Sequence, residues 1–489
     1  MTRGLRAGLK AAALSGIVLA VAVASGCTVD VTPEDDPAAV VERPLTVATF
    51  GRVTTTDPAA ATDTGSTIYA LNVFQRLMTV QVGTGALKPD AATDCWYIDE
   101  LTYSCGIRKN LSFTNGNDLT ASDVKFSIER ARALAVPGSS ARLLDTIEEM
   151  IIPEDDEWRI DFKLKQHDRA FGYALASPAA SIVDESVYNA NELWPQWQRP
   201  SSSGPFFADV SNLDELRLIR YQRYNGPYWP STPAVSLKTY STPEALDRAV
   251  ATRTVDVLWR VPPGRVPNDG TFEAEDLPGA AVQRLVWNPD SPRRDDAAVR
   301  EWVRDATGTI RTLDSVVPEG AGFSAATFSM GDRPEAHGVS GELTLGFDSR
   351  LPGQAEMADR VKTALEPELT VRLVGDDPDA DVRLRLTQAW TNTELAWLQP
   401  YVEFPLPGRE AAVRELELAF RAAETLPDAE AAAQALQEAA AADATVVPLA
   451  QADETFWKTP GVGFNPVNIE HQNWIGPCWQ LGLWGFTHV

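Results

Sequence analysis

Segments with strand and helix patterns alternate along most of this chain. Residues 45–50 are rich in β-branched side chains, as strands are, and residues 66–78 then space their apolar side chains as a helix does. The alternation returns further along, where a strand at 282–287 precedes a helix at 297–307 and a strand at 341–347. The length of 489 residues exceeds what one domain of about 100–200 residues holds. The sequence therefore predicts an α/β protein of two or three domains.

Local signals mark the bounds of other elements. A capping-box pattern that begins at Thr120 predicts the start of a helix. Residues 409–442 are rich in Ala and Glu, and they predict two helices that are separated at Pro427. Proline and glycine are concentrated over 262–279, and tryptophan, proline and serine over 194–205, so we expect loops in both places.

The N-terminus has the pattern of an export signal. Residues 1–10 are basic and contain no acid, and the apolar run over 11–24 is shorter than the roughly 20 residues that span a membrane. The run ends in Ala24-Ser-Gly-Cys27, which resembles a bacterial lipobox, although Ala24 stands where Leu is usual. We expect a signal peptide over 1–26, a lipid on Cys27 that anchors the protein to the outer face of the cytoplasmic membrane, and a flexible acidic tether over 27–43. The alternatives are an ordinary signal peptide before a chance cysteine, and an uncleaved anchor.

An extracytoplasmic location permits disulfides. Residues 96–107 predict a hairpin around Asp99-Glu100, and Cys95 and Cys105 lie symmetrically about that turn. We expect these two cysteines to be paired across the hairpin, the alternative being two buried free thiols. Cys478 is then expected to be a buried structural residue.

Charge and motif content argue against several classes of function. The chain has 68 acidic and 43 basic residues, a net charge of −25, and such a surface repels the phosphates of nucleic acids. It contains no GxxxxGK[ST], HExxH, paired CxxC or GxSxG pattern, and its four histidines are scattered. We therefore expect no metal, no cofactor and no enzymatic activity, a profile that fits a binding protein better than a catalyst.

Several motifs occur in an order that one known family shows. The most specific is the run from Leu101 to Phe113, followed by the turn Asn115-Gly116 and by Leu119-Thr-Ala-Ser-Asp-Val-Lys-Phe-Ser-Ile-Glu-Arg130. The others are Asp57-Pro-Ala59, Ser203-Gly-Pro-Phe206, Arg223-Tyr-Asn-Gly-Pro-Tyr-Trp229, Val255-Asp-Val257 and Val446-Val-Pro-Leu449. Over residues 45–465, the chain thus resembles the bacterial extracellular solute-binding proteins of family 5, which serve oligopeptide and dipeptide ABC importers.

The resemblance implies an α/β two-lobe periplasmic-binding-protein clamshell of type II-like topology, with an extra subdomain in the first lobe. Lobe I would combine residues 44–85, 200–285 and 450–489; the extra subdomain would be 86–199, and lobe II 286–449. Such a protein captures a peptide or a related small solute, closes by a hinge between its lobes, and delivers the solute to the permease subunits of an ABC importer.

Two departures from the family limit what the resemblance implies. Its peptide binders often have Trp-x-x-Asp in lobe II, whose carboxylate pairs with the α-ammonium group of the peptide. The matching stretch here, Trp390-Thr-Asn-Thr393, lacks the acid, and a buried ammonium group without a counter-charge is costly. Glu394 is adjacent, but on a strand its side chain would point to the other face. A helix that is usual before the strand at 341–347 is also absent, so lobe II is expected to be trimmed.

The ligand-binding candidates follow from these matches. Trp390 is the candidate for an aromatic wall, and Asn392 and Thr393 could form hydrogen bonds to a neutral ligand. Gln75 takes the place of a family Glu and is expected at the cleft, and Trp457 follows the return strand. The structural alternatives are that the tryptophans belong to the core and that Asn392 and Thr393 are plain loop residues.

Other functions stay open at this point. The missing aspartate favours a non-peptide solute such as a glycoside, an opine or a metal chelate. The trimmed lobe favours a degenerate clamshell that acts as an envelope interaction or signalling lipoprotein. A secreted hydrolase is a third class, supported only by the abundance of acidic residues.

Overall fold

The structure is a computed structural model. It describes residues 43–488 apart from 81–85, 197, 210–211, 260, 262, 319–322, 333, 335–337, 350, 352, 388–392 and 465–482. Residues 44–489 form one compact unit. The predicted signal peptide, Cys27 and Cys478 lie outside the described residues. In the part of the chain that is described, no helix is long and apolar enough to cross a membrane.

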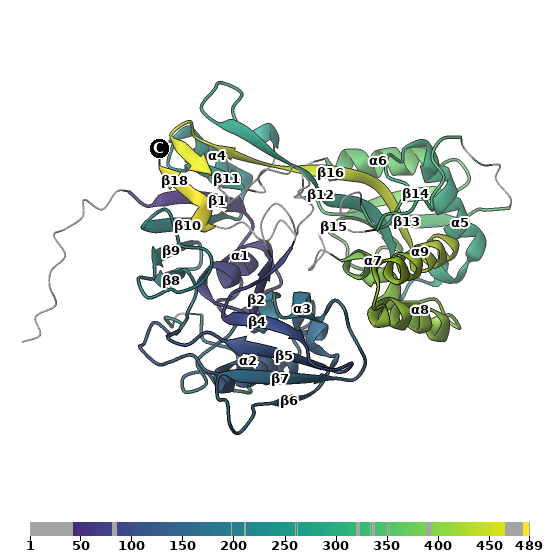
Figure 1. The fold of residues 1–489 in the computed structure, drawn as a ribbon. Helices are drawn as coiled ribbons and strands as arrows, with labels where there is room; N and C mark the ends of the chain where they lie inside the picture. Colours follow the sequence, from purple (N-terminus) through teal and green to yellow (C-terminus); the bar gives the residue numbers. More distant parts are fainter. Residues whose placement is uncertain are drawn as a thin grey trace, which may run out of the picture. The chain divides into compact units, whose positions relative to one another are not determined.

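A ten-stranded mixed sheet runs through the unit (Figure 1). Its strands are, in spatial order, β14 (Thr370–Gly375), β13 (Glu342–Phe347), β15 (Val382–Thr387), β12 (Glu273–Trp287), β16 (Val446–Lys458), β11 (Val257–Trp259), β1 (Leu45–Phe50), β10 (Ala234–Tyr240), β9 (Glu215–Arg220) and β8 (Phe206–Asp209). The predicted strand over 45–50 is β1, which pairs in parallel with β10 and β11.

The two longest strands, β12 and β16, pair antiparallel and join the two ends of this sheet (Figure 1). The loop that we expected over 262–279 is therefore wrong from Glu273 onward, where β12 has already begun. Pro278 and Gly279 fall within a register shift between Leu277 and Ala281. A strand tolerates proline and glycine at an irregularity of this kind.

Helices α1 (Thr64–Val73) and α4 (Pro243–Ala251) lie beside the half of the sheet that contains β1 (Figure 1). Here a hydrophobic core, which we call core I, contains Val47, Phe74 and Trp259. The helix expected over 66–78 begins earlier, because the Asp63 carboxylate caps the backbone N–H of Ser66, and it ends at Val73. The residues after it still bury their apolar side chains, and this burial explains the longer apolar pattern.

A second sheet has four strands in the order β4 (Ala92–Tyr97), β5 (Thr102–Ile107), β7 (Arg159–Leu164) and β6 (Ile147–Ile151). It packs with α2 (Ala121–Leu134) and α3 (Phe171–Ala174) around core II, which contains Phe113, Ile160 and Phe162. The predicted capping box at Thr120 begins α2. Two small hairpin sheets, β2 (Met78–Val80) with β3 (Leu87–Pro89) and β17 (Val462–Phe464) with β18 (Phe486–His488), complete the strands.

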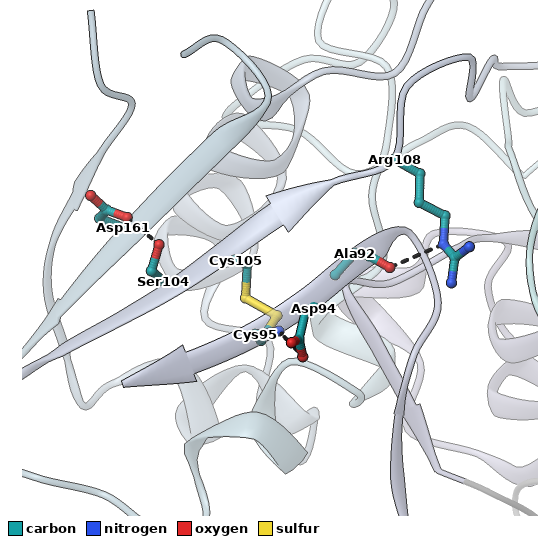
Figure 2. Close-up of a disulfide and its surroundings, with 7 residues drawn as sticks. All are labelled: Ala92, Asp94, Cys95, Ser104, Cys105, Arg108 and Asp161. Carbon is teal, nitrogen blue, oxygen red and sulfur yellow. Dashed lines mark hydrogen bonds between the residues drawn. A yellow bond between two sulfur atoms is a disulfide. The ribbon is translucent and has the colours of Figure 1, made fainter. Parts of the chain in front are cut away.

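Figure 2 shows the disulfide between Cys95 and Cys105, which are direct partners on β4 and β5, with sulfur atoms 2.06 Å apart. On the neighbouring pair of strands, the Ser104 hydroxyl donates to Asp161 at 2.6 Å. The structure thus links the edge strand of the second sheet covalently to its neighbour, across the hairpin that the sequence predicts.

The other end of the large sheet carries core III, which contains Trp302, Trp397 and Phe420. Its helices are α5 (Ala297–Ala306), α6 (Gln354–Leu365), α7 (Glu394–Glu403), α8 (Glu410–Ala422) and α9 (Leu426–Asp443). Pro427 lies in the first turn of α9, where proline is tolerated, so the predicted pair of helices is separated just before it. Among the described residues between α5 and β13, only a short 3-10 turn over Thr307–Thr309 is helical.

Candidate functional site

A cavity of about 530 Å³ lies between residues that follow α2 and helices α7 and α8. One wall comes from residues 142–174, whose buried apolar side chains belong to core II, and the opposite wall comes from residues 393–421, most of whose buried apolar side chains belong to core III. We call the chain around each core the core II part and the core III part. The volume is within the range of about 300–1,000 Å³ that small-molecule sites have. The cavity is therefore a candidate solute site that both parts of the chain must supply.

The walls of the cavity are rich in paired charges. Arg421 donates from Nη1 to Asp168 Oδ2 at 2.5 Å and from Nε to Glu417 Oε1 at 2.9 Å. A second ion pair joins Arg142 to Glu403. Burial raises the pKa of the Asp168 carboxyl, and the Arg421 guanidinium acts in the opposite direction. Asp168, Glu403 and Glu417 thus each have an arginine partner, whereas Asp145 and Glu410 also line the cavity and add negative charge to its walls.

Thr393 lines this cavity, directly before the first residue of α7, and it is buried, with 9% of its surface exposed. The expectation that Glu394 would lie on a strand is wrong, because Glu394 begins α7. Its carboxylate accepts a hydrogen bond from the Phe323 N–H at 2.9 Å. The acid that follows Thr393 in the sequence is thus hydrogen-bonded to the backbone. Trp390 and Asn392 lie outside the described residues, and their ligand contacts stay predictions.

Gln75 lies in a buried polar network, with 1% of its surface exposed. Its Nε2 donates to Asp90 Oδ1 at 3.0 Å, and the Arg76 N–H donates to Asp90 Oδ2 at 3.1 Å. Burial raises the pKa of Asp90, and Arg76 opposes that shift. In this structure the Gln75 amide is committed to an internal partner, so a role in ligand binding would require it to exchange that partner.

Trp457 is half-buried on β16, opposite Leu258 of β11 and Ala274 of β12. It packs against a small hydrophobic cluster that includes Leu246 and Phe272. Neither Trp457 nor Gln75 is among the described residues that line the 530 Å³ cavity. The structure therefore places only Thr393 of the described candidates there.

The charged residues of the cavity walls gave almost no signal in the sequence. Asp168 and Arg421 are 253 positions apart, and nothing local relates them. Glu417 and Arg421 are four positions apart on α8, a spacing that predicts an ion pair within a helix but not a contact with another part of the chain.

The chain was compared with known proteins. The family described as "Bacterial extracellular solute-binding proteins, family 5 Middle" matches residues 86–332, half of the chain. The glutathione-binding protein GsiB of Escherichia coli O1:K1 is 24% identical over 205 residues, which are 41% of this chain and 38% of that protein. The probable D,D-dipeptide-binding periplasmic protein DdpA of Escherichia coli K12 is 23% identical over 293 residues, 56% of each chain. The chain thus matches well under two thirds of the length of either relative.

Solved structures resemble the chain over most of its length. The binding protein AgaA from Agrobacterium tumefaciens R10, in complex with agropinic acid, has a TM-score of 0.75 and 18% identity, and the match covers 91% of this chain and 99% of AgaA. A dipeptide-binding protein from Pseudoalteromonas sp. SM9913, in complex with Met-Leu, also has a TM-score of 0.75, with 14% identity over 91% of this chain and all of that one. At these identities the likeness shows a shared fold.

Proposed function

This chain belongs to the bacterial extracellular solute-binding proteins of family 5, and we propose that it captures a peptide or a related small solute and delivers it to an ABC importer. The observation that carries the proposal is the cavity whose two walls come from the core II and core III parts of the chain. A solute held between two such walls favours the closed arrangement of the parts, which is the signal that an importer of this class needs.

The fold agrees with this class of protein. The expected α/β two-lobe fold is confirmed by solved binding proteins that match 91% of the chain. Because β12 and β16 connect the two ends of the large sheet, the register shift between Leu277 and Ala281 is a natural place for hinge bending. The named relatives are described as binding proteins.

For the ligand, we propose a solute that does not depend on a free α-ammonium group. Thr393 stands where the family's peptide binders often have an aspartate, and the carboxylate of the adjacent Glu394 is engaged by the Phe323 N–H. A free ammonium group buried here would lose its hydration without gaining a counter-charge from this position. N-blocked peptides and neutral solutes avoid that cost.

Calorimetric titrations with dipeptides and with their N-acetylated forms test this ligand class. We expect the protein to prefer the N-acetylated forms. We expect Thr393→Asp to raise the affinity for the free dipeptides about tenfold or more, because a charge-assisted hydrogen bond contributes about 1.5–3 kcal/mol. Thr393→Asn is the matched control, since it has the shape of Asp without the charge and should not raise that affinity. Tighter binding of free dipeptides by the unaltered protein would contradict the proposed ligand class.

We further propose that Cys27 carries a lipid that anchors the protein outside the cytoplasmic membrane. The basic residues 1–10, the apolar run over 11–24 and the lipobox-like end support this. We expect Cys27→Ser to move the protein from the membrane fraction to the soluble fraction, or to leave its signal peptide uncleaved, as fractionation and immunoblotting would show. Unchanged processing and membrane retention would contradict the anchor.

A further inference from the structure

Arg421 lies between two carboxylates that come from different parts of the chain. Glu417 is one turn before it on α8, and Asp168 precedes α3. Phe420, beside Arg421, belongs to core III, whereas Phe171, close to Asp168, belongs to core II. The Arg421–Asp168 ion pair therefore crosses from one wall of the cavity to the other.

The core II part holds Asp168 ready for this contact. Its Oδ1 accepts the Ala170 N–H at 3.0 Å, and its backbone carbonyl accepts the Tyr97 hydroxyl at 2.7 Å. The Asp168 side chain is 2% exposed and that of Arg421 is 17% exposed. Because Asp168 is already fixed by its own part of the chain, formation of the ion pair costs little additional side-chain entropy.

Further contacts near this ion pair join the same two parts of the chain. The Arg169 N–H donates to the carbonyl of Arg421 at 3.1 Å, and the Arg169 guanidinium lies 5.7 Å from the centroid of the Phe420 ring. The Arg142–Glu403 pair joins the same two parts of the chain. All these contacts favour the arrangement in which the two parts lie together.

The ion pair matters differently in the closed and the open arrangement. When the two parts are together, Asp168 is buried, and without Arg421 it would be a buried charge without its partner, which is costly. When the parts separate, water reaches Asp168, and the loss of Arg421 then costs little. Removal of Arg421 should therefore disfavour the closed arrangement selectively.

On this geometry we propose that Arg421 and Asp168 form a latch across the cavity that favours the closed arrangement and thereby sets the affinity for the solute. The part of this proposal that concerns affinity rests on the proposed function. The part that concerns closure does not, because the ion pair links the two parts of the chain directly.

The latch can be tested on the purified protein without added solute, by small-angle X-ray scattering. We expect Arg421→Gln and Asp168→Asn each to increase the radius of gyration, because each removes one charge of the pair. Asp168→Asn keeps an oxygen that can accept the Ala170 N–H, so this variant serves if Arg421→Gln folds poorly. Arg372→Gln is the matched control, since Arg372 pairs at 3.0 Å with Glu342 on the adjacent strand, exposed and within one part of the chain.

The same variants should also change affinity. With a mixture of N-acetylated dipeptides as the probe, we expect each latch variant to bind about tenfold more weakly or worse, and the double variant to bind no more weakly than either single variant. Unchanged scattering in both latch variants, with thermal unfolding showing that they are folded, would overturn the latch. If the unaltered protein binds no probe but the latch variants still expand, the latch holds and the proposed function is what fails.

Discussion

Replacement of Arg130 by methionine is expected to lower the free energy of unfolding by about 3–5 kcal/mol, because it leaves a buried carboxylate without its counter-charge. Arg130, on α2, donates from Nη1 to Asp57 Oδ1 at 3.0 Å and from Nη2 to Asp57 Oδ2 at 2.5 Å. The side chains are 2% and 0% exposed. Methionine fills much of the same space, so the loss reports the missing charge and hydrogen bonds more than the missing volume.

This ion pair also connects distant segments. Arg130 donates to the carbonyls of Asn189 and Glu192, each at 2.7 Å, and Asp57 accepts the Trp194 N–H at 2.7 Å. Loss of Arg130 therefore releases the chain around 189–194 as well as α2.

Chemical denaturation measures the effect, with Arg372→Met as the control. Arg372 forms an exposed ion pair with Glu342, and such pairs contribute about 1 kcal/mol or less. If Arg130→Met costs no more than Arg372→Met, then the buried pair does not stabilise the fold as we argue.

Gly204→Ala is expected to destabilise the protein by about 3 kcal/mol, because the added methyl group would meet backbone atoms that cannot move aside. A Cβ at this position would lie 2.4 Å from the carbonyl carbon of Val73 and 2.5 Å from its oxygen. The Gly204 N–H donates to that same oxygen at 2.9 Å, so the two backbones are held in close contact.

Gly461→Ala is the matched control for this substitution. A Cβ at Gly461 would meet nothing within 4 Å, so we expect a change in unfolding free energy close to zero. Equal midpoints for the two variants in a denaturant titration would show that the close approach at Gly204 is not a constraint.

Asp57, Arg130 and Gly204 all lie in motifs through which the sequence resembles its family. In the structure they bind segments of the chain to one another and do not line the described cavity. The motifs thus predicted the fold well, because they report its internal contacts. The same property makes them poor guides to the ligand.

Elements with local signals could be predicted from the sequence. The strand over Leu45–Phe50 and the helix that begins after Thr120 have such signals in their β-branched residues and capping box. By contrast, α7 was not predicted, because Pro400 lies inside it and because we expected Glu394, where the helix begins, to lie on a strand. The long strand β12 was misjudged at its start, because its pairing with β16 depends on residues far away in the chain.

The site was less predictable than the fold. The resemblance to the family pointed to Thr393, which lines the cavity, and its contact with a ligand stays a prediction. Gln75 was expected at the cleft; it is 1% exposed and donates to Asp90, a partner that no local pattern reveals. The contact between Asp168 and Arg421 spans 253 positions, and only the folded chain brings these two side chains together.

The central claim is that the protein binds a small solute between its two parts. Thermal unfolding of the purified protein with pools of peptides and of small polar solutes tests it most directly. We predict that at least one pool raises the unfolding temperature, since a solute at a hundredfold excess over its Kd adds about 2.7 kcal/mol of stability. Tryptophan fluorescence should change with the same pool. If no pool shifts unfolding or fluorescence, or if a compound is turned over, the account of this protein as a solute-binding protein is contradicted.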